Sequence, residues 1–396
     1  MKRLIHARVV PHFYGLPLFL FPITTAGSGI ALGLLLLVYG LSNEWQNWRE
    51  IGLRRWAWPW ALFIFWTLIG LAWTTNMFFG QKVAVATGYG LLAFLGATLS
   101  WNQATIKIVI RYFLFGILLN ELIAIMMTLQ LLPWPNGDGP MTGLCDHIFL
   151  SFILAHALFW LSYDWKHQWC FPRWITTLLF LLFILQLFIA PARSGQLTFV
   201  LFFPIALAIL YPGRWRWGLP VLGLALILVV AFTPELRVHF SQGITELLHF
   251  NLGKNDISSS WGLRLLAMWA GLLMFFNHPL VGVGTGNFYP AALQLMHAHI
   301  IPGDGGFIMN TAANSFLSVA ASQGSIGLIL FLLVIWFVGR EAWFARNTPW
   351  GWFALSYFII YLVGGLFDSL NWGYADAITV ALMAGLPLHR RERAEL

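Results

Sequence analysis

Two arginines have a setting that suits anion recognition. Arg193 lies in the segment PARSGQ between two apolar runs, and Arg264 lies one turn into an expected helix over 259–276, in a chain with only 9% charged residues. Arginine stays charged and presents a planar fork of donors, which suits a phosphate or a pyrophosphate. The alternative is that each side chain extends to a lipid headgroup. Both interpretations place an anion beside these arginines.

A second group of polar residues could bind a hydroxyl-bearing substrate. Asp146 and His147 open an apolar run, and Asn314 precedes another, so these residues could line a substrate cavity or simply cap helices. His297 and His299 lie in the segment LMHAHI. Histidine is the commonest general base in enzymes, although exposed histidines are also ordinary surface residues.

The elements that carry these residues are membrane helices. The chain is 59% hydrophobic with a mean hydropathy of +0.75, more than a soluble domain of 396 residues can bury. The net charge of +7 comes from basic residues in short loops, which fits a membrane protein better than a nucleic-acid partner. No HExxH, CxxC or Asp-x-Asp motif is present, so neither a metal site nor a cofactor is expected.

The apolar runs predict an all-α polytopic membrane protein with about twelve transmembrane helices. They form a single membrane domain over 1–396, which contains one large loop over 234–315. The expected spans are 14–24, 27–41, 56–74, 83–99, 108–128, 147–163, 174–190, 196–211, 217–233, 316–337, 350–366 and 373–388.

The loop charges indicate the orientation of the chain. If 14–24 and 27–41 form a hairpin around PITTAG rather than one long helix, both termini are cytoplasmic, and seventeen Lys and Arg residues face inward against five outward. The 234–315 loop then faces the periplasm or the exterior. Asp368 and Asp376 flank the last outer turn and are expected to be solvated.

The local motifs resemble those of the O-antigen ligase / O-antigen polymerase superfamily of bacterial membrane glycosyltransferases. The motifs are Arg264 in a helix, then HPLVGVGTGNF, ANSFL and GSIGL, with PARSG as the matching outer turn. Each piece is weak alone, and the combination is specific. The resemblance implies a GT-C-like fold in the bacterial inner membrane with a large periplasmic loop.

This resemblance also implies a function. Family members are metal-independent, inverting transferases that take a glycan from an undecaprenyl-pyrophosphate carrier at the periplasmic face. The acceptor is lipid A–core in ligases, another carrier-linked repeat in polymerases, and a protein Ser or Tyr in related oligosaccharyltransferases. By this resemblance, Arg193 and Arg264 bind the pyrophosphate and stabilise it as the leaving group.

The chain departs from the family pattern at one position. The family histidine before Asn-Ser-Phe-Leu falls at Ala313, and alanine cannot accept a proton. The base could instead be His297, His299 or Asp304, the chain could be an inactive variant, or its acceptor and mechanism could differ.

The sequence slightly favours a ligase over a polymerase, because the predicted 234–315 loop is compact. The alternative from another class is a transporter or flippase of lipid-linked saccharides. Transporters usually show repeat symmetry and interrupted helices in matching halves, which this sequence lacks. A non-catalytic scaffold is a third interpretation, which Ala313 keeps open.

Overall fold

A computed structural model of the chain describes residues 2–42, 44–52, 54–133, 142–190, 193–211, 213, 241, 260–302, 309–370 and 381–386. The regular elements in this described part are all helices. They are α1 (Lys2–Leu20), α2 (Thr25–Leu41), η1 (Glu44–Asn47), α3 (Trp48–Ile51), α4 (Ala57–Ile69), η2 (Gly70–Trp73), α5 (Met77–Gly88), α6 (Leu91–Thr98), α7 (Gln103–Thr128), α8 (His147–His167), α9 (Arg173–Ile189), α10 (Arg193–Leu210), α13 (Ser260–Asn277), α14 (Phe288–His297), α15 (Ser315–Phe344) and α16 (Pro349–Phe367).

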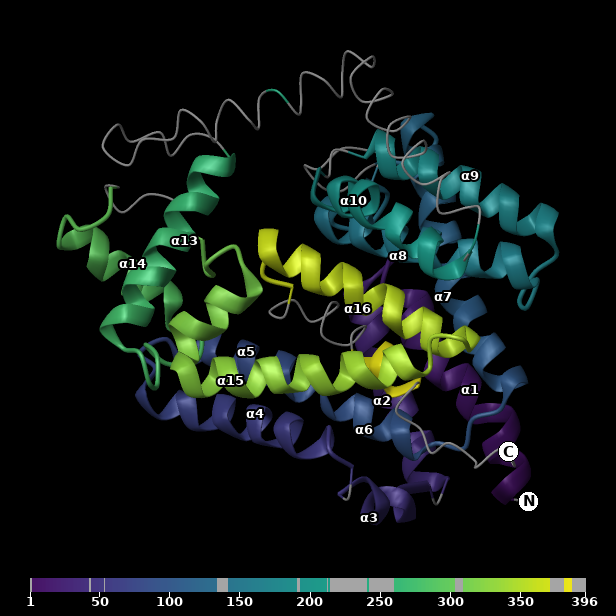
Figure 1. The fold of residues 1–396 in the computed structure, drawn as a ribbon, viewed down its shortest axis with the longest axis horizontal. Coiled ribbons are helices and arrows are strands. Elements are labelled where there is room, and N and C mark those ends of the chain that lie inside the picture. Colours follow the sequence, from purple (N-terminus) through teal and green to yellow (C-terminus); the bar gives the residue numbers. More distant parts are fainter. Residues whose placement is uncertain are drawn as a thin grey trace.

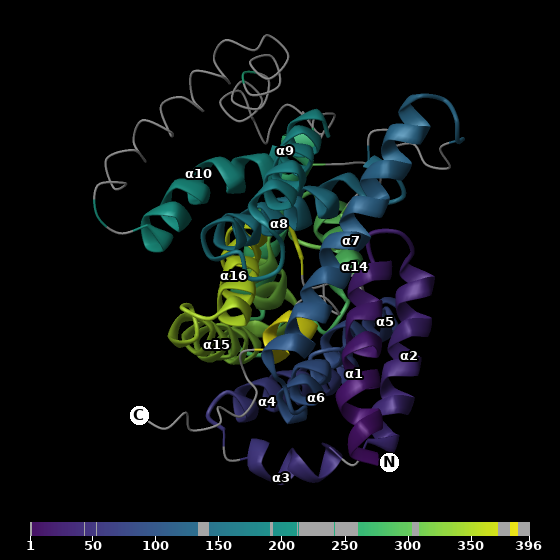
Figure 2. The ribbon, with the colours of Figure 1, turned by 90° about the vertical axis from the view of Figure 1, so that its right-hand side faces the viewer.

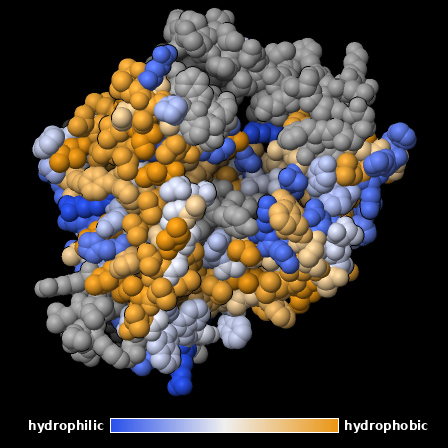
Figure 3. All heavy atoms as spheres, turned by 180° about the vertical axis from the view of Figure 1, so that it is seen from behind, coloured by the Kyte–Doolittle hydropathy of each residue, from blue (hydrophilic) through white to orange (hydrophobic). Residues whose placement is uncertain are grey.

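The helices are those of a multi-pass membrane protein. In the described part of the chain, five stretches are long and apolar enough to cross a membrane, namely Met77–Thr98, Gln103–Thr128, His147–His167, Ser315–Phe344 and Pro349–Phe367, and six shorter apolar helices accompany them. Many large apolar side chains point outward, and Figure 3 shows broad hydrophobic areas on the surface. Such an outer surface suits lipid better than water.

Most of the expected spans correspond to helices. The expected segment 217–233 and most of 373–388 lie outside the described residues, so the number twelve stays a prediction. The expected span 83–99 is interrupted at Tyr89 and Gly90, between α5 and α6. A side chain at Gly90 would meet the indole nitrogen of Trp60, so close packing of α4 accompanies this break.

The first two apolar segments form a hairpin, as predicted. α1 ends at Leu20, and α2 begins after Thr24, whose side chain accepts a hydrogen bond from the Gly27 amide at 3.2 Å. Because Thr24 is the N-cap of a new helix, α1 and α2 are two separate helices. α1 then packs between α2 and α7, as Figure 2 shows.

α8 lies at the centre of the fold. It contacts α9, α10 and α16 (Figure 1), and all of its residues over 149–164 are buried. α16 in turn contacts α15, and α15 packs against α4 and α13. These contacts bring the start of α8, the start of α15 and the end of α16 toward one region.

α15 contains a sharp backbone break. Gly324, inside it, has a φ of 67°, and the chain around this break pairs with the segment that follows α13. The amides of Val283 and Gly284 donate to the carbonyls of Ala321 and Ser322, and the Ser325 amide donates to Pro279. These bonds fix α13 against α15 and so position the residues that α13 carries.

Candidate functional site

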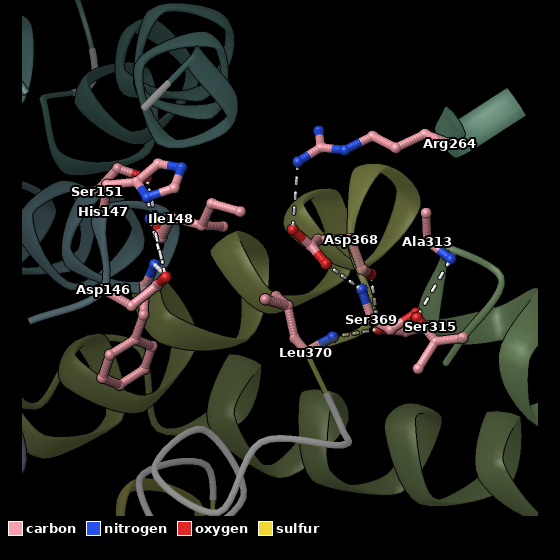
Figure 4. Close-up of polar contacts among 12 residues, drawn as sticks. Asp146, His147, Ile148, Ser151, Arg264, Ala313, Ser315, Asp368, Ser369 and Leu370 are labelled. Atoms are coloured by element: carbon pink, nitrogen blue, oxygen red, sulfur yellow. Dashed lines mark hydrogen bonds and ion pairs between the residues drawn. The ribbon is translucent and has the colours of Figure 1, made fainter. Parts of the chain in front are cut away.

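The candidate site lies where the ends of several helices meet. The start of α8 carries Asp146 and His147, α13 carries Arg264, and Ala313 and Ser315 stand at the start of α15. Asp368 follows the last residue of α16. Figure 4 shows these residues around a common space, with the Asp146–His147 pair and Arg264 on opposite sides of Asp368.

Arg264 and Asp368 form an ion pair. The guanidinium Nη2 lies 3.7 Å from Asp368 Oδ2, and the two side chains are 17% and 20% exposed. Within the described residues Asp368 is the only polar partner of Arg264, so most of the five donors of the guanidinium are uncommitted. The pair therefore retains the capacity to bind an anion.

The Asp368 carboxyl is electrostatically unusual. Burial raises its pKa above the ordinary range, and the positive charge of Arg264 opposes that rise. The charges of Asp146 and His147 also influence this pKa, which places that pair near Asp368. The expectation that Asp368 is solvated is therefore wrong, whereas Asp376 lies outside the described residues.

Serine hydroxyls hold the loop after α16 against the start of α15. Ser315 Oγ donates to the Asp368 carbonyl at 3.1 Å and accepts from the Leu370 amide at 2.9 Å. One turn later, Ser318 Oγ lies 2.8 Å from Ser369 Oγ. Asp368 is thus fixed by its backbone, and its carboxylate is directed at Arg264.

Ala313 lies in a tight turn just before α15. It is fully buried, and its φ of 49° is in the left-handed region, which is uncommon for alanine. The next residue, Asn314, is the N-cap of α15: its Oδ1 accepts from the Leu317 amide at 2.9 Å, and its Nδ2 donates to the Leu366 carbonyl at 3.0 Å. Asn314 therefore has a structural role at the edge of the site.

Asp146 and His147 form a second polar pair. Asp146 Oδ1 accepts from the amides of Ile148 and Phe149 at 3.0 and 3.1 Å, so Asp146 caps α8. Its Oδ2 lies 3.8 Å from His147 Nδ1. The side chains of His147 and Asp146 are 32% and 59% exposed, which leaves both accessible to a substrate.

Arg193 is the first residue of α10, and its side chain lies outside the described part of the structure. Two residues later, Gly195 packs so closely on α8 that a Cβ there would lie 2.3 Å from Ser151 Oγ. The start of α10 therefore meets the first turns of α8. The backbone places Arg193 at the same end of α8 as His147.

The structure places His297 at the end of α14 and His299 just after it, and α14 packs against α13. Leu263, Leu266 and Ala270 line a small apolar cavity with Met296, so this face of α13 meets α14. Gly271 lies two turns beyond Arg264 on α13, and a Cβ added there would lie 3.0 Å from Ala312 Cβ and 3.1 Å from Leu317 Cγ, so this side of α13 faces the start of α15.

The two histidines are exposed, in α14 and just after it, and no hydrogen bond or ion pair joins them to Arg264 among the described residues. Asp304 lies outside the described residues.

The glycine-rich segment has a packing role. Gly282, Gly284 and Gly286 all have positive φ, and a Cβ at Gly282 or Gly286 would overlap the backbone of a neighbouring segment. Thr285 Oγ1 donates to the Thr67 carbonyl at 2.8 Å, and Asn287 Oδ1 accepts from Thr75 Oγ1 at 2.7 Å. The motif thus joins α13 and α15 to the α4–α5 region.

The fold and this site define a polytopic membrane protein, helical throughout its described part, with a paired arginine and a histidine–aspartate pair where helix ends meet. Among the described residues, no group of three or more His, Cys, Asp or Glu side chains could hold a metal ion.

Residues 178–332 match the model of a family described as Wzy_C, O-antigen ligase. The chain carries an O-antigen ligase family domain, which confirms the resemblance seen in the motifs. Members of this family are glycosyltransferase-type enzymes, and lipid-linked glycans are the substrates that the family implies. The matched range contains Arg193, Arg264 and Ala313. No curated protein matches the sequence.

Proposed function

We propose that this protein transfers a glycan from undecaprenyl pyrophosphate to lipid A–core at the periplasmic face of the bacterial inner membrane. The observation that carries the proposal is Arg264, which lies within the family domain and has Asp368 as its only polar partner among the described residues. A partly buried arginine with uncommitted donors suits a diphosphate better than a neutral ligand.

The chemistry follows from the leaving group. Glycosyl transfer breaks the bond between the anomeric carbon and the diphosphate oxygen, and negative charge develops on that oxygen. Arg264, with Arg193 from the start of α10, stabilises this charge in a site of low dielectric. Because the diphosphate is already a good leaving group, two cations suffice and no metal is needed. A single attack by the acceptor on the face opposite the diphosphate makes the transfer inverting.

The sequence charge supports a periplasmic location of the site. The seventeen-to-five excess of Lys and Arg in the predicted inner loops puts both termini in the cytoplasm. Asp146, Arg193, Arg264 and Asp368 then lie on the outer side. The donor carrier and lipid A–core are both amphipathic, so they reach this side within the membrane.

The transfer assay uses purified protein with undecaprenyl-pyrophosphate glycan as the donor. Lipid A–core, a second carrier-linked repeat unit and a Ser- or Tyr-containing peptide are offered as acceptors in separate reactions. Transfer to lipid A–core supports the ligase, and transfer to another acceptor assigns the polymerase or the protein oligosaccharyltransferase. Movement of the donor across vesicles without transfer would instead support the transporter.

Ala313→His is tested beside the unchanged chain. If the chain as it stands transfers glycan, its base lies elsewhere, with His297, His299 and Asp304 as the candidates by sequence. If only the histidine variant transfers, position 313 is the place of the base and the chain is an inactive form. Arg264→Ala is the negative control in each reaction.

A further inference from the structure

Glycan transfer requires a general base, and the assignment of that base rests on the proposed function. In the transfer, the acceptor hydroxyl must lose a proton as its oxygen attacks the anomeric carbon. Ala313 has no group that accepts a proton, and its methyl group is fully buried. The base must therefore be another side chain that reaches the space in front of Arg264.

Three titratable side chains besides Arg264 are placed at this space by the described structure. Asp368 pairs with Arg264, so it lies on the side of the leaving diphosphate. One carboxylate oxygen of Asp146 already accepts two backbone amides as the helix cap. His147 lies across Asp368 from Arg264, where an acceptor attacking opposite the leaving group would stand (Figure 4).

We infer that His147 is the general base that deprotonates the acceptor hydroxyl, and that Asp146 positions its imidazole. His147 Nδ1 lies 3.8 Å from Asp146 Oδ2, so a proton on Nδ1 would face the carboxylate and Nε2 would meet the acceptor. In Figure 4 the second ring nitrogen points away from Asp146. Catalytic hydrogen bonds are often long before substrate binds, and a carboxylate–imidazole pair of this kind is a recurrent catalytic arrangement.

Atoms and electrons balance in this step. The acceptor O–H proton passes to His147 Nε2 while the oxygen lone pair forms the new bond to the anomeric carbon. The bond from that carbon to the diphosphate oxygen breaks, and its electron pair leaves with the diphosphate, opposite Arg264. The resulting imidazolium, stabilised by Asp146, then releases its proton to water.

Three substitutions test this assignment. His147→Ala removes the base. Asp146→Ser removes the carboxylate beside the imidazole and keeps a good helix cap, because serine caps helices about as well as aspartate. His278→Ala is the matched control, since His278 is an exposed histidine after the end of α13.

The readouts are kcat for transfer, its pH profile and the binding of undecaprenyl pyrophosphate. His147→Ala should lower kcat by about 10²–10⁴-fold, keep lipid binding within about twofold, and regain part of its rate when imidazole is added. Asp146→Ser should lower kcat less, shift the pH profile, and add no further loss in the His147→Ala background. Asp368 and Arg264 face the same space, so their charges contribute to that profile in every variant.

His147→Ala with a kcat within about threefold of the unchanged chain would overturn the assignment, because a general base contributes more than that. Loss of lipid binding in parallel with transfer, without imidazole rescue, would also overturn it and assign His147 a structural role. Transfer by Ala313→His alone would also overturn the assignment, because position 313 would then be the place of the base. Failure of both the unchanged chain and Ala313→His with every acceptor overturns the proposed transferase itself, so these two proteins are assayed before the other variants.

Discussion

Ser315, the first residue of α15, donates a hydrogen bond to the backbone carbonyl of Asp368, just beyond α16, at 3.1 Å. The same hydroxyl accepts the buried amide of Leu370 at 2.9 Å. One side chain thereby ties the acid that faces Arg264 to the turn that contains Ala313. Nothing in the local sequence around Asp368 indicates this connection.

Ser315→Ala should weaken both the site and the fold. It leaves the Leu370 amide without its partner, which costs about 1–3 kcal/mol, and it releases the backbone that directs Asp368 at Arg264. Transfer rate and thermal unfolding in detergent measure the two effects. Thr177→Ala is the control, since Thr177 makes an exposed bond to the carbonyl four residues earlier. A Ser315→Ala protein as active and stable as the unchanged chain would contradict the positioning role.

Arg264→Lys should impair transfer although the charge is conserved. Lysine offers a compact point charge and cannot reproduce the planar fork, so about 10²–10³-fold should be lost from kcat. Steady-state transfer with saturating donor gives the value. Arg346→Lys is the control, because Arg346 stacks on Trp343 beyond the far end of α15 from the site. Full activity of Arg264→Lys would show that a simple cation suffices and that no bidentate contact is made.

Asp368 gives the site a pH dependence. Burial raises the pKa of the Asp368 carboxyl, so this group takes up a proton at a higher pH than an ordinary aspartate does. Once Asp368 is neutral, no carboxylate competes with the diphosphate for Arg264. Binding of undecaprenyl-pyrophosphate glycan should therefore tighten as the pH falls through that pKa. In Asp368→Asn, binding should already be tight at neutral pH and flat on the acid side. Weaker binding by Asp368→Asn would instead mean that the carboxylate holds Arg264 in its binding position.

Features that depend on local pattern could be predicted from the sequence. The apolar runs predicted most of the helices, and the basic N-terminus favoured the hairpin of α1 and α2 over one long helix. A helix was expected over 259–276, and α13 occupies Ser260–Asn277. In each case the signal is contained in a few consecutive residues.

Relationships between distant segments could not be predicted in this way. Asp368 was expected to be solvated, because nothing beside it in the sequence shows that Arg264 lies opposite. The left-handed turn at Ala313 was missed for a similar reason, since it depends on how the start of α15 meets α16. The partner of the Gly-rich segment, the break in α15, likewise appears only in three dimensions.

The break in α15 depends on Gly324. Gly324→Ala should disrupt the junction of α13 and α15, because Gly324 has a φ of 67° and a Cβ there would lie 2.2 Å from the carbonyl carbon of Leu280. With a ψ of −168° the backbone of Gly324 lies in a region that is essentially restricted to glycine, which costs an alanine on the order of 1–3 kcal/mol, and the overlap with backbone adds to this. Thermal unfolding followed by tryptophan fluorescence should show a clear loss of stability. Transfer should also be lost, because α13 carries Arg264.

Gly33→Ala in α2 is the matched control for Gly324→Ala. An added Cβ at Gly33 meets nothing within 4 Å, so stability should be unchanged or slightly higher. Equal unfolding temperatures for the two variants would show that the break at Gly324 does not hold α13 in place.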